Sequence, residues 1–168
     1  QIIVLGHYKN LLTYLFKAIE FKNIASVGYY VGGMKKDALK ESESKKIIIA
    51  TYAMASEALD IKTLSSLIMA TPKSNVEQCI GRILRVKHDR PLVVDIVDQH
   101  EFFNRQWLKR KRFYAKEKYK IKRTNNKSYF KNEWITLFDG KRMKAYNEKK
   151  ANDLLNGKCL IQPDSDSD

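Results

Sequence analysis

The run Ile47-Ile48-Ile49-Ala50 decides the fold class of this 168-residue chain, because it is apolar at every position. A strand with one face in water alternates apolar and polar residues, whereas a strand covered on both faces is apolar throughout. Comparable strand candidates recur along the first part of the chain, at residues 2–5, 27–31, 67–70 and 92–97. The pattern therefore predicts a mainly parallel sheet that is buried between helices.

The segments between these runs have helical character. Residues 9–21 carry apolar side chains at helical spacing, and further helices are expected at 34–43, 53–58 and 74–86. This alternation predicts a doubly wound α/β domain over residues 1–98. Ligands of such domains bind at the carboxyl ends of the strands. The residue pairs at those ends are Gly6-His7, Gly32-Gly33, Thr51-Tyr52 and Thr71-Pro72. We interpret His7 as a polar residue whose hydrogen bonds are made within the protein, in preference to a residue that binds a ligand.

The composition changes after Asp98. Residues 99–131 contain twelve basic and two acidic side chains, interleaved with aromatic residues. We predict a basic, mostly helical extension over residues 99–162, starting with a long helix, and an acidic disordered tail over 163–168. One stripe of this helix, formed by Phe103, Trp107 and Tyr114, fits a packing face, with a base-stacking platform as the alternative.

The overall charge points to a polyanionic partner. The formal net charge is +13, which favours nucleic acid ahead of a membrane surface. No segment has the length of a transmembrane helix, so no membrane role is expected. Cys79 and Cys159 lack the spacing of zinc ligands and are expected to be reduced thiols; we expect no metal site. The chain starts at Gln1 with an apolar run, and we expect it to be a piece of a longer protein.

The stretch Gln78-Cys79-Ile80-Gly81-Arg82-Ile83-Leu84-Arg85 places three polar side chains at helical spacing. Gln78, Arg82 and Arg85 would share one face of a helix. Two guanidinium groups on one face suit a phosphate, which planar donors bind well, and Gly81 permits close approach to the backbone. The alternative is an ordinary solvated basic face.

This stretch resembles motif VI of superfamily 2 helicases, and the upstream segments follow the order of that family's second RecA-like domain. Residues 1–21 resemble motif IV, 30–36 the segment called motif IVa, and 49–61 motif V, while 70–74 lead into motif VI. The run Ala-Thr-Tyr-Ala-Met-Ala-Ser-Glu at 50–57 is similar to the helicases of large cytoplasmic DNA viruses. That group includes the poxvirus transcript-release helicase and lies in the branch of XPB and UvsW.

The resemblance implies roles in an ATP site. Arg85 would be the arginine finger at the γ-phosphate, Arg82 its supporting contact, and Gln78 would orient water or bridge to the first domain. Asp60 would lie near the nucleotide sugar or a neighbouring arginine. Position 58 is Ala where many relatives have Gly, a departure that affects this assignment. Glu57 and Gly81 complete the implied nucleotide contacts.

Nucleic-acid contacts are expected on the same domain and on the extension. Thr51 can offer a hydroxyl to a phosphate, or it can only cap the following helix. The remaining candidates are Gly32, Gly33, Lys35, Lys36, Lys109, Arg110, Arg112 and Tyr119. Lys35 and Lys36 have the alternative of simply facing solvent.

The sequence holds no G-x-x-x-x-G-K-[ST] loop and no acidic magnesium box. In the family these belong to the first RecA-like domain, which would bind most of the ATP and Mg²⁺. We therefore expect half of an ATP-dependent DNA helicase or translocase, inactive as an ATPase alone. The alternative is a non-catalytic nucleic-acid-binding module on a RecA-like scaffold.

The resemblance also implies partners and a location. The expected partners are single-stranded or forked DNA, with RNA or an RNA–DNA hybrid as alternatives, and the first RecA-like domain of the same protein. It further implies a viral protein that acts in transcription or DNA processing. Its place would be viral replication sites in the host cytoplasm, with packaging in the virion as a further expectation.

Overall fold

The computed structural model describes residues 1–57, 61–83, 86, 88 and 90–140. Contacts divide the chain into two compact units, Gln1–Arg110 and Lys111–Asp168, and each is described by itself. The predicted boundary at Asp98 lies earlier than the observed one, because the first part of the helix that follows packs with the first unit. The predicted tail at 163–168, like residues 141–162, lies outside the described residues.

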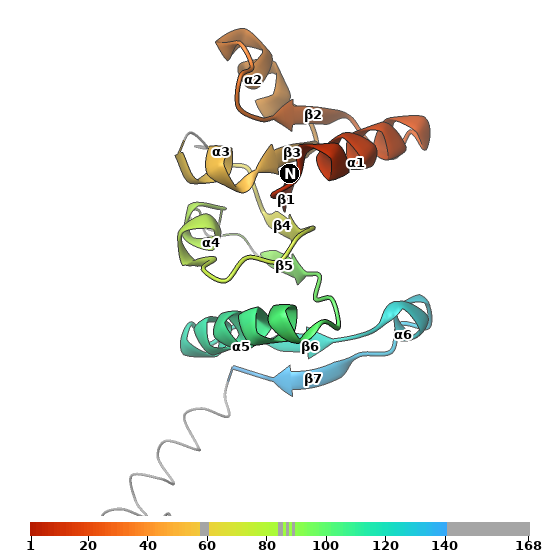
Figure 1. Cartoon of the computed structure of the whole chain (residues 1–168), viewed down its shortest axis with the longest axis vertical. Coiled ribbons are helices and arrows are strands. Elements are labelled where there is room, and N and C mark those ends of the chain that lie inside the picture. Colours follow the sequence, from red (N-terminus) through yellow and green to blue (C-terminus); the bar gives the residue numbers. More distant parts are fainter. Residues whose placement is uncertain (58–60, 84–85, 87, 89, 141–168) are drawn as a thin grey trace, which may run out of the picture. The chain divides into compact units, whose positions relative to one another are not determined.

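The first unit is built on a five-stranded sheet in which every neighbouring pair is parallel (Figure 1). Its order is β2-β3-β1-β4-β5. The strands are β1 (Ile2–Gly6), β2 (Val27–Tyr30), β3 (Ile47–Thr51), β4 (Ser66–Met69) and β5 (Leu92–Asp95). The helices are α1 (Lys9–Phe21), α2 (Lys36–Glu43), α3 (Tyr52–Glu57), α4 (Glu77–Ile83) and α5 (Glu101–Lys116).

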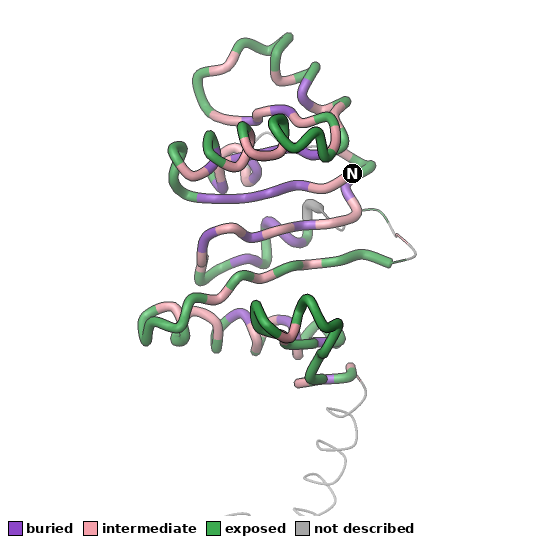
Figure 2. The backbone as a smooth tube through the Cα atoms, turned by 90° about the vertical axis from the view of Figure 1, so that its right-hand side faces the viewer, coloured by how far each residue is buried: buried purple, intermediate pink, exposed green. Residues whose placement is uncertain are grey.

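This arrangement confirms the predicted mainly parallel α/β sheet. The central strands β1 and β3 are buried almost along their whole length, as Figure 2 shows for the strand that starts at the N-terminus. Their continuous apolar sequence reflects this, since both faces of a central strand are covered. The edge strands β2 and β5 have alternating burial instead.

The two faces of the sheet carry different helices. Val4, Ile47 and Ile49 lie on one face and form a core cluster with Leu12 of α1. On the other face α2 comes so close to β2 that a Cβ on Gly28 would lie 2.8 Å from the Cα of Ser42. Right-handed crossovers place α3 and α4 on this second face as well, and these two helices contact each other.

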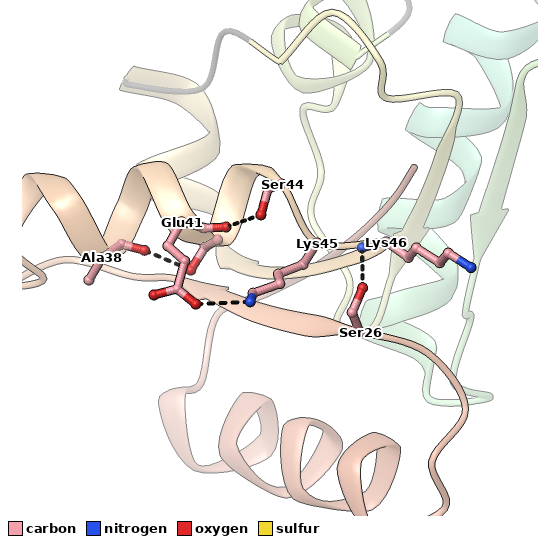
Figure 3. Close-up of polar contacts among 7 residues, drawn as sticks. Ser26, Ala38, Glu41, Ser44, Lys45 and Lys46 are labelled. Atoms are coloured by element: carbon pink, nitrogen blue, oxygen red, sulfur yellow. Dashed lines mark hydrogen bonds and ion pairs between the residues drawn. The ribbon is translucent and has the colours of Figure 1, made fainter.

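Hydrogen bonds fasten the amino-terminal edge of the sheet at the end of α2 (Figure 3). The Lys46 backbone N–H donates to the Ser26 hydroxyl at 3.0 Å, which joins the entries of β2 and β3. Lys45 pairs with Glu41 one helical turn earlier, at 2.9 Å. This ion pair is exposed to solvent and contributes little to stability. The amino-terminal edge is thus held by local contacts, which leaves the carboxyl edge for ligands.

The second unit begins within α5 and continues into a small antiparallel sheet of β6 (Ile121–Arg123) and β7 (Ile135–Phe138), joined through α6 (Asn126–Phe130). This sheet was not predicted from the sequence. Helix α5 ends at a Schellman motif, although no glycine is present there. Lys118 takes the left-handed conformation at φ 59°, and the Tyr119 N–H donates to the Tyr114 carbonyl at 2.9 Å.

Candidate functional site

A pocket of about 400 Å³ opens where β1, β2 and β3 end. Its lining comes from Gly6, His7, Lys9, Gly32, Thr51, Tyr52, Ala53 and Met54. Two of the residues predicted to bind nucleic acid, Thr51 and Gly32, are therefore brought together from separate strands. The pocket lies at the carboxyl edge of the parallel sheet, where ligands of doubly wound folds bind.

Thr51 serves as the helix cap that was the alternative interpretation of this residue. Its hydroxyl oxygen accepts from the Met54 N–H at 3.4 Å, a long hydrogen bond at the start of α3. This contact uses the oxygen as an acceptor, so the hydroxyl proton can still be donated to a phosphate. The nucleic-acid role of Thr51 remains a prediction that the geometry permits.

His7, which was interpreted as a satisfied polar residue, and Lys9, which was not singled out from the sequence, both line this pocket. The His7 ring lies against the Tyr52 ring, with 4.6 Å between centroids. Burial and the nearby Lys73 charge lower the pKa of His7 below its usual 6.5, only partly offset by a hydrogen bond to the Pro72 backbone. The position of both residues just after β1 was the available signal, because strand ends converge at the carboxyl edge.

Tyr52 links the end of β3 to the segment that follows β4. Its hydroxyl donates to the Thr71 carbonyl at 2.7 Å, and the Lys73 ammonium lies 4.8 Å from the ring centre. The Thr71 hydroxyl oxygen in turn accepts from the His7 backbone N–H at 3.0 Å. Burial raises the pKa of the Tyr52 hydroxyl, with a further contribution from the Asp95 charge. The hydroxyl therefore stays protonated and keeps donating at neutral pH.

Arg110 on α5 also binds the segment that follows β4. Its Nε and Nη2 donate to the two carboxylate oxygens of Asp95 at 2.7 and 2.8 Å. Its Nη1 donates to the Lys73 carbonyl at 2.8 Å. The arginine side chain is 0% exposed and that of Asp95 only 9%. A bidentate pair of this kind, with a third bond to backbone, fixes its partners in position.

The prediction that Arg110 binds nucleic acid is therefore wrong. The guanidinium group is buried and its charge is matched by Asp95, so it cannot reach a phosphate. The neighbouring candidates Lys109 and Arg112 are exposed, as are Gly32, Gly33, Lys35 and Lys36. Their nucleic-acid contacts remain predictions.

Tyr119 is half-buried and lies between two other rings of its unit. Its ring centre is 6.3 Å from those of Phe113 and Tyr114, and burial raises the pKa of its hydroxyl. Tyr114 itself is buried. In the stripe formed by Phe103, Trp107 and Tyr114, this packing favours a structural role for the C-terminal member, Tyr114. It leaves the Tyr119 ring only partly available for stacking on bases.

Helix α4 contains residues 78–83 of the predicted arginine motif and begins shortly after the segment Thr71–Lys73. Gln78 and Gly81 are exposed, and a Cβ on Gly81 would meet nothing within 4 Å. Cys79 and Ile80 are buried and pack this helix against the core. Arg82 lies in α4 and Glu57 ends α3, whereas Arg85 and Asp60 lie outside the described residues.

The described residues contain no group of three or more potential metal ligands. In the same part of the chain, no helix combines the length and apolar character that a membrane crossing requires.

The parallel sheet, its strand order and its polar carboxyl edge define the class: this is a RecA-like α/β domain. Among solved structures, the chain is similar to the C-terminal domain of S. cerevisiae Dbp5. The TM-score is 0.56 at 17% identity, over 67% of this chain and 69% of the other. No family model matches the sequence.

Two viral proteins are similar in sequence. One, from Acanthamoeba polyphaga mimivirus, is 44% identical over 117 residues, which cover 68% of this chain. The other, from African swine fever virus, is 35% identical over 130 residues, which cover 71%. Both carry the name "Putative ATP-dependent RNA helicase". The matches span 22% and 26% of the length of these relatives, respectively. The chain is therefore similar to one part of two viral proteins that are named as helicases, and it has the fold of a RecA-like domain.

Proposed function

We propose that this chain is the C-terminal motor domain of a viral ATP-dependent helicase or translocase. The observation that carries the proposal is the anchoring of the segment Thr71–Lys73, which leads directly into α4. Tyr52, His7 and Arg110 bind this segment from three different elements. Such preorganisation suits a helix whose arginines must reach a fixed point in a partner domain.

In this proposal Arg85 stabilises the charge that develops on the transferred phosphoryl group, and Arg82 supports it. Gln78, exposed on the same helix, orients water or contacts the partner domain. Gly81 lets the partner approach the backbone, and Asp60 and Glu57 are the proposed contacts to the nucleotide. ATP and Mg²⁺ are bound mainly by the first RecA-like domain, because this chain lacks the phosphate loop.

The pocket at the ends of β1 to β3 is proposed to hold a nucleic-acid phosphate. Lys9 brings positive charge, Thr51 a hydroxyl, and Gly32 leaves the backbone accessible. Gly33, Lys35 and Lys36 extend this surface, and Lys109 and Arg112 add charge on α5. We propose single-stranded or forked DNA as the substrate. RNA is the second candidate, because both viral relatives are named as RNA helicases.

The proposed setting follows from the viral relatives. The protein would act in transcription or DNA processing at viral replication sites in the host cytoplasm, and it would also be packaged in the virion. Its enzymatic activity would belong to the complete protein, in which both RecA-like domains meet.

The test is nucleic-acid-stimulated ATP hydrolysis by the full-length protein carrying Arg85→Ala or Arg82→Ala. Loss of a finger arginine lowers turnover by about 10³- to 10⁵-fold while nucleotide binding persists. Arg90→Ala is the matched control, because Arg90 is exposed and has no proposed role. Stimulation by DNA and RNA strands of equal sequence decides the substrate. Unchanged turnover in Arg85→Ala would favour the alternative, a non-catalytic binding module.

A further inference from the structure

An exposed group of aromatic rings lies in the second unit, at the turn between β6 and β7 where Figure 1 shows α6. Tyr129, Phe130 and Trp134 form this group, which we call the aromatic tip. Their exposed fractions are 58%, 88% and 43%. Tyr129 meets Phe130 and Trp134 edge to face, with ring centres 5.8 and 5.9 Å apart. Single exposed apolar residues are ordinary on a protein surface, but three adjacent rings indicate a binding surface.

The backbone under the aromatic tip is tightly hydrogen-bonded. At the start of α6, the Asn125 side-chain oxygen accepts from the N–H groups of Lys127 and Ser128 at 3.0 and 2.9 Å. At its end, Asn132 takes the left-handed conformation at φ 56°, and the Glu133 N–H donates to the Ser128 carbonyl at 2.9 Å. The helix is thus capped at both ends, so the rings are presented on an ordered support.

The orientation of one ring is fixed by a hydrogen bond of its own. The indole N–H of Trp134 donates to the Asn132 side-chain oxygen at 3.1 Å. Nearby, the Thr124 hydroxyl donates to the Glu133 carbonyl at 2.9 Å, which ties the two sides of the turn together. A preorganised aromatic face loses little conformational entropy when it binds a flat partner.

The surroundings of the aromatic tip are strongly basic. Residues 118–138 contain six basic side chains, whereas Glu133 is their only acid. The basic residues are Lys118, Lys120, Lys122, Arg123, Lys127 and Lys131, and all six are exposed. Positive charge beside exposed rings matches a ligand with a negative backbone and flat, apolar faces. Single-stranded nucleic acid has both properties, whereas a duplex hides its base faces.

We propose that the aromatic tip is a base-stacking site for single-stranded nucleic acid, with Phe130 and Trp134 contacting bases and Lys127 and Lys131 contacting phosphates. This inference rests on the proposed function, because it assumes that the complete protein acts on a nucleic-acid strand. It adds a contact point that lies on a different unit from the pocket at the sheet edge.

The test compares variants of the full-length protein in binding to a single strand and to a blunt duplex of equal length, at several salt concentrations. Loss of one stacked base costs about 1–3 kcal/mol, so Phe130→Ala and Trp134→Ala should each weaken single-strand binding by at least about 5-fold. Duplex binding should change by less than about 2-fold. Phe130→Trp should retain affinity and Phe130→Leu should not.

Salt separates the two kinds of contact. Phe130→Ala should leave the slope of log affinity against log salt unchanged, because a ring releases no counterions. Lys127→Ala combined with Lys131→Ala should reduce the slope by about 1.4 for a single strand, at roughly 0.7 per phosphate. Phe21→Ala is the matched control, because Phe21 on α1 is 90% exposed but lacks neighbouring aromatic partners at comparable distances among the described residues.

Two results would overturn the inference while leaving the proposed function intact. One is equal binding of the single strand by Phe130→Ala and Phe21→Ala; the other is an equal loss of single-strand and duplex binding in Phe130→Ala. If the wild-type protein bound no nucleic acid and Arg85→Ala left ATP hydrolysis unchanged, the proposed function would fail as well.

Discussion

Replacing Arg110 with alanine tests how the arginine helix is held. The change removes three hydrogen bonds of 2.7 to 2.8 Å and leaves the Asp95 carboxylate buried without its cation. The Lys73 carbonyl also loses a donor. Breaking a buried ion pair by removing one partner costs about 3–5 kcal/mol, and we expect Arg110→Ala to lower the free energy of unfolding by that amount.

The assay is urea unfolding of the chain, followed by far-UV circular dichroism. Arg112→Ala is the matched control, since Arg112 lies on the same helix but is exposed, and it should change stability by less than about 0.5 kcal/mol. Arg110→Lys keeps the charge but cannot form the bidentate contact, so it should fall between the two.

A double-mutant cycle isolates the pair itself. Asp95→Ala alone leaves a buried guanidinium group, so it should also be strongly destabilising. The double variant, with Arg110→Ala added, should cost less than the sum of the single changes by about 1–3 kcal/mol. If Arg110→Ala were no more destabilising than Arg112→Ala, the argument that this arginine anchors the segment before α4 would be refuted.

Four further substitutions test other parts of the structure. Gly28→Ala should destabilise the chain by about 1–3 kcal/mol in urea unfolding, since its Cβ would strike Ser42 of α2. Gly32→Ala, where a Cβ meets nothing, should be close to neutral, and similar values for both would contradict the packing of α2 on β2. Tyr52→Phe should cost about 1–2 kcal/mol, because a buried carbonyl loses its donor; an unchanged unfolding midpoint would argue against this link. The lowered pKa of His7 means that its contribution to stability is present above pH 6.5 and is lost as the pH falls through the folded value. A phosphate bound in the pocket would raise the pKa of His7, so nucleic-acid binding should strengthen below pH 6.5. His7→Gln should remove this pH dependence of binding. If His7→Gln and the wild-type protein had the same pH profile, the phosphate would bind elsewhere.

The sheet was predictable because its strands are short apolar runs, and an apolar composition indicates burial. Ile47–Ala50 could only be a strand covered on both faces, and the helix predicted at residues 9–21 has those bounds in the structure. The order of the motifs then predicted a domain over residues 1–98, which is most of the first unit. Edge strand β5 was also found, although its burial alternates, because its β-branched residues are typical of strands.

The role of Arg110 could not be read from the sequence. It stands in a run of four basic residues, Lys109–Arg112, and only its pairing with Asp95 on a separate strand distinguishes it from its neighbours. The end of α5 could not be predicted from the sequence, for a different reason. Lys118 adopts a left-handed conformation that usually requires glycine or asparagine, so the local sequence carries no stop signal.

The central claim is that this chain is one half of an ATP-driven motor. The most direct measurement compares nucleic-acid-stimulated ATP hydrolysis by three purified proteins: residues 1–168 alone, the full-length protein, and the full-length protein lacking this segment. We predict hydrolysis only by the full-length protein, because in this proposal Arg82 and Arg85 and the phosphate loop belong to different domains. Stimulated hydrolysis by residues 1–168 alone, or undiminished hydrolysis after the segment is removed, would contradict it.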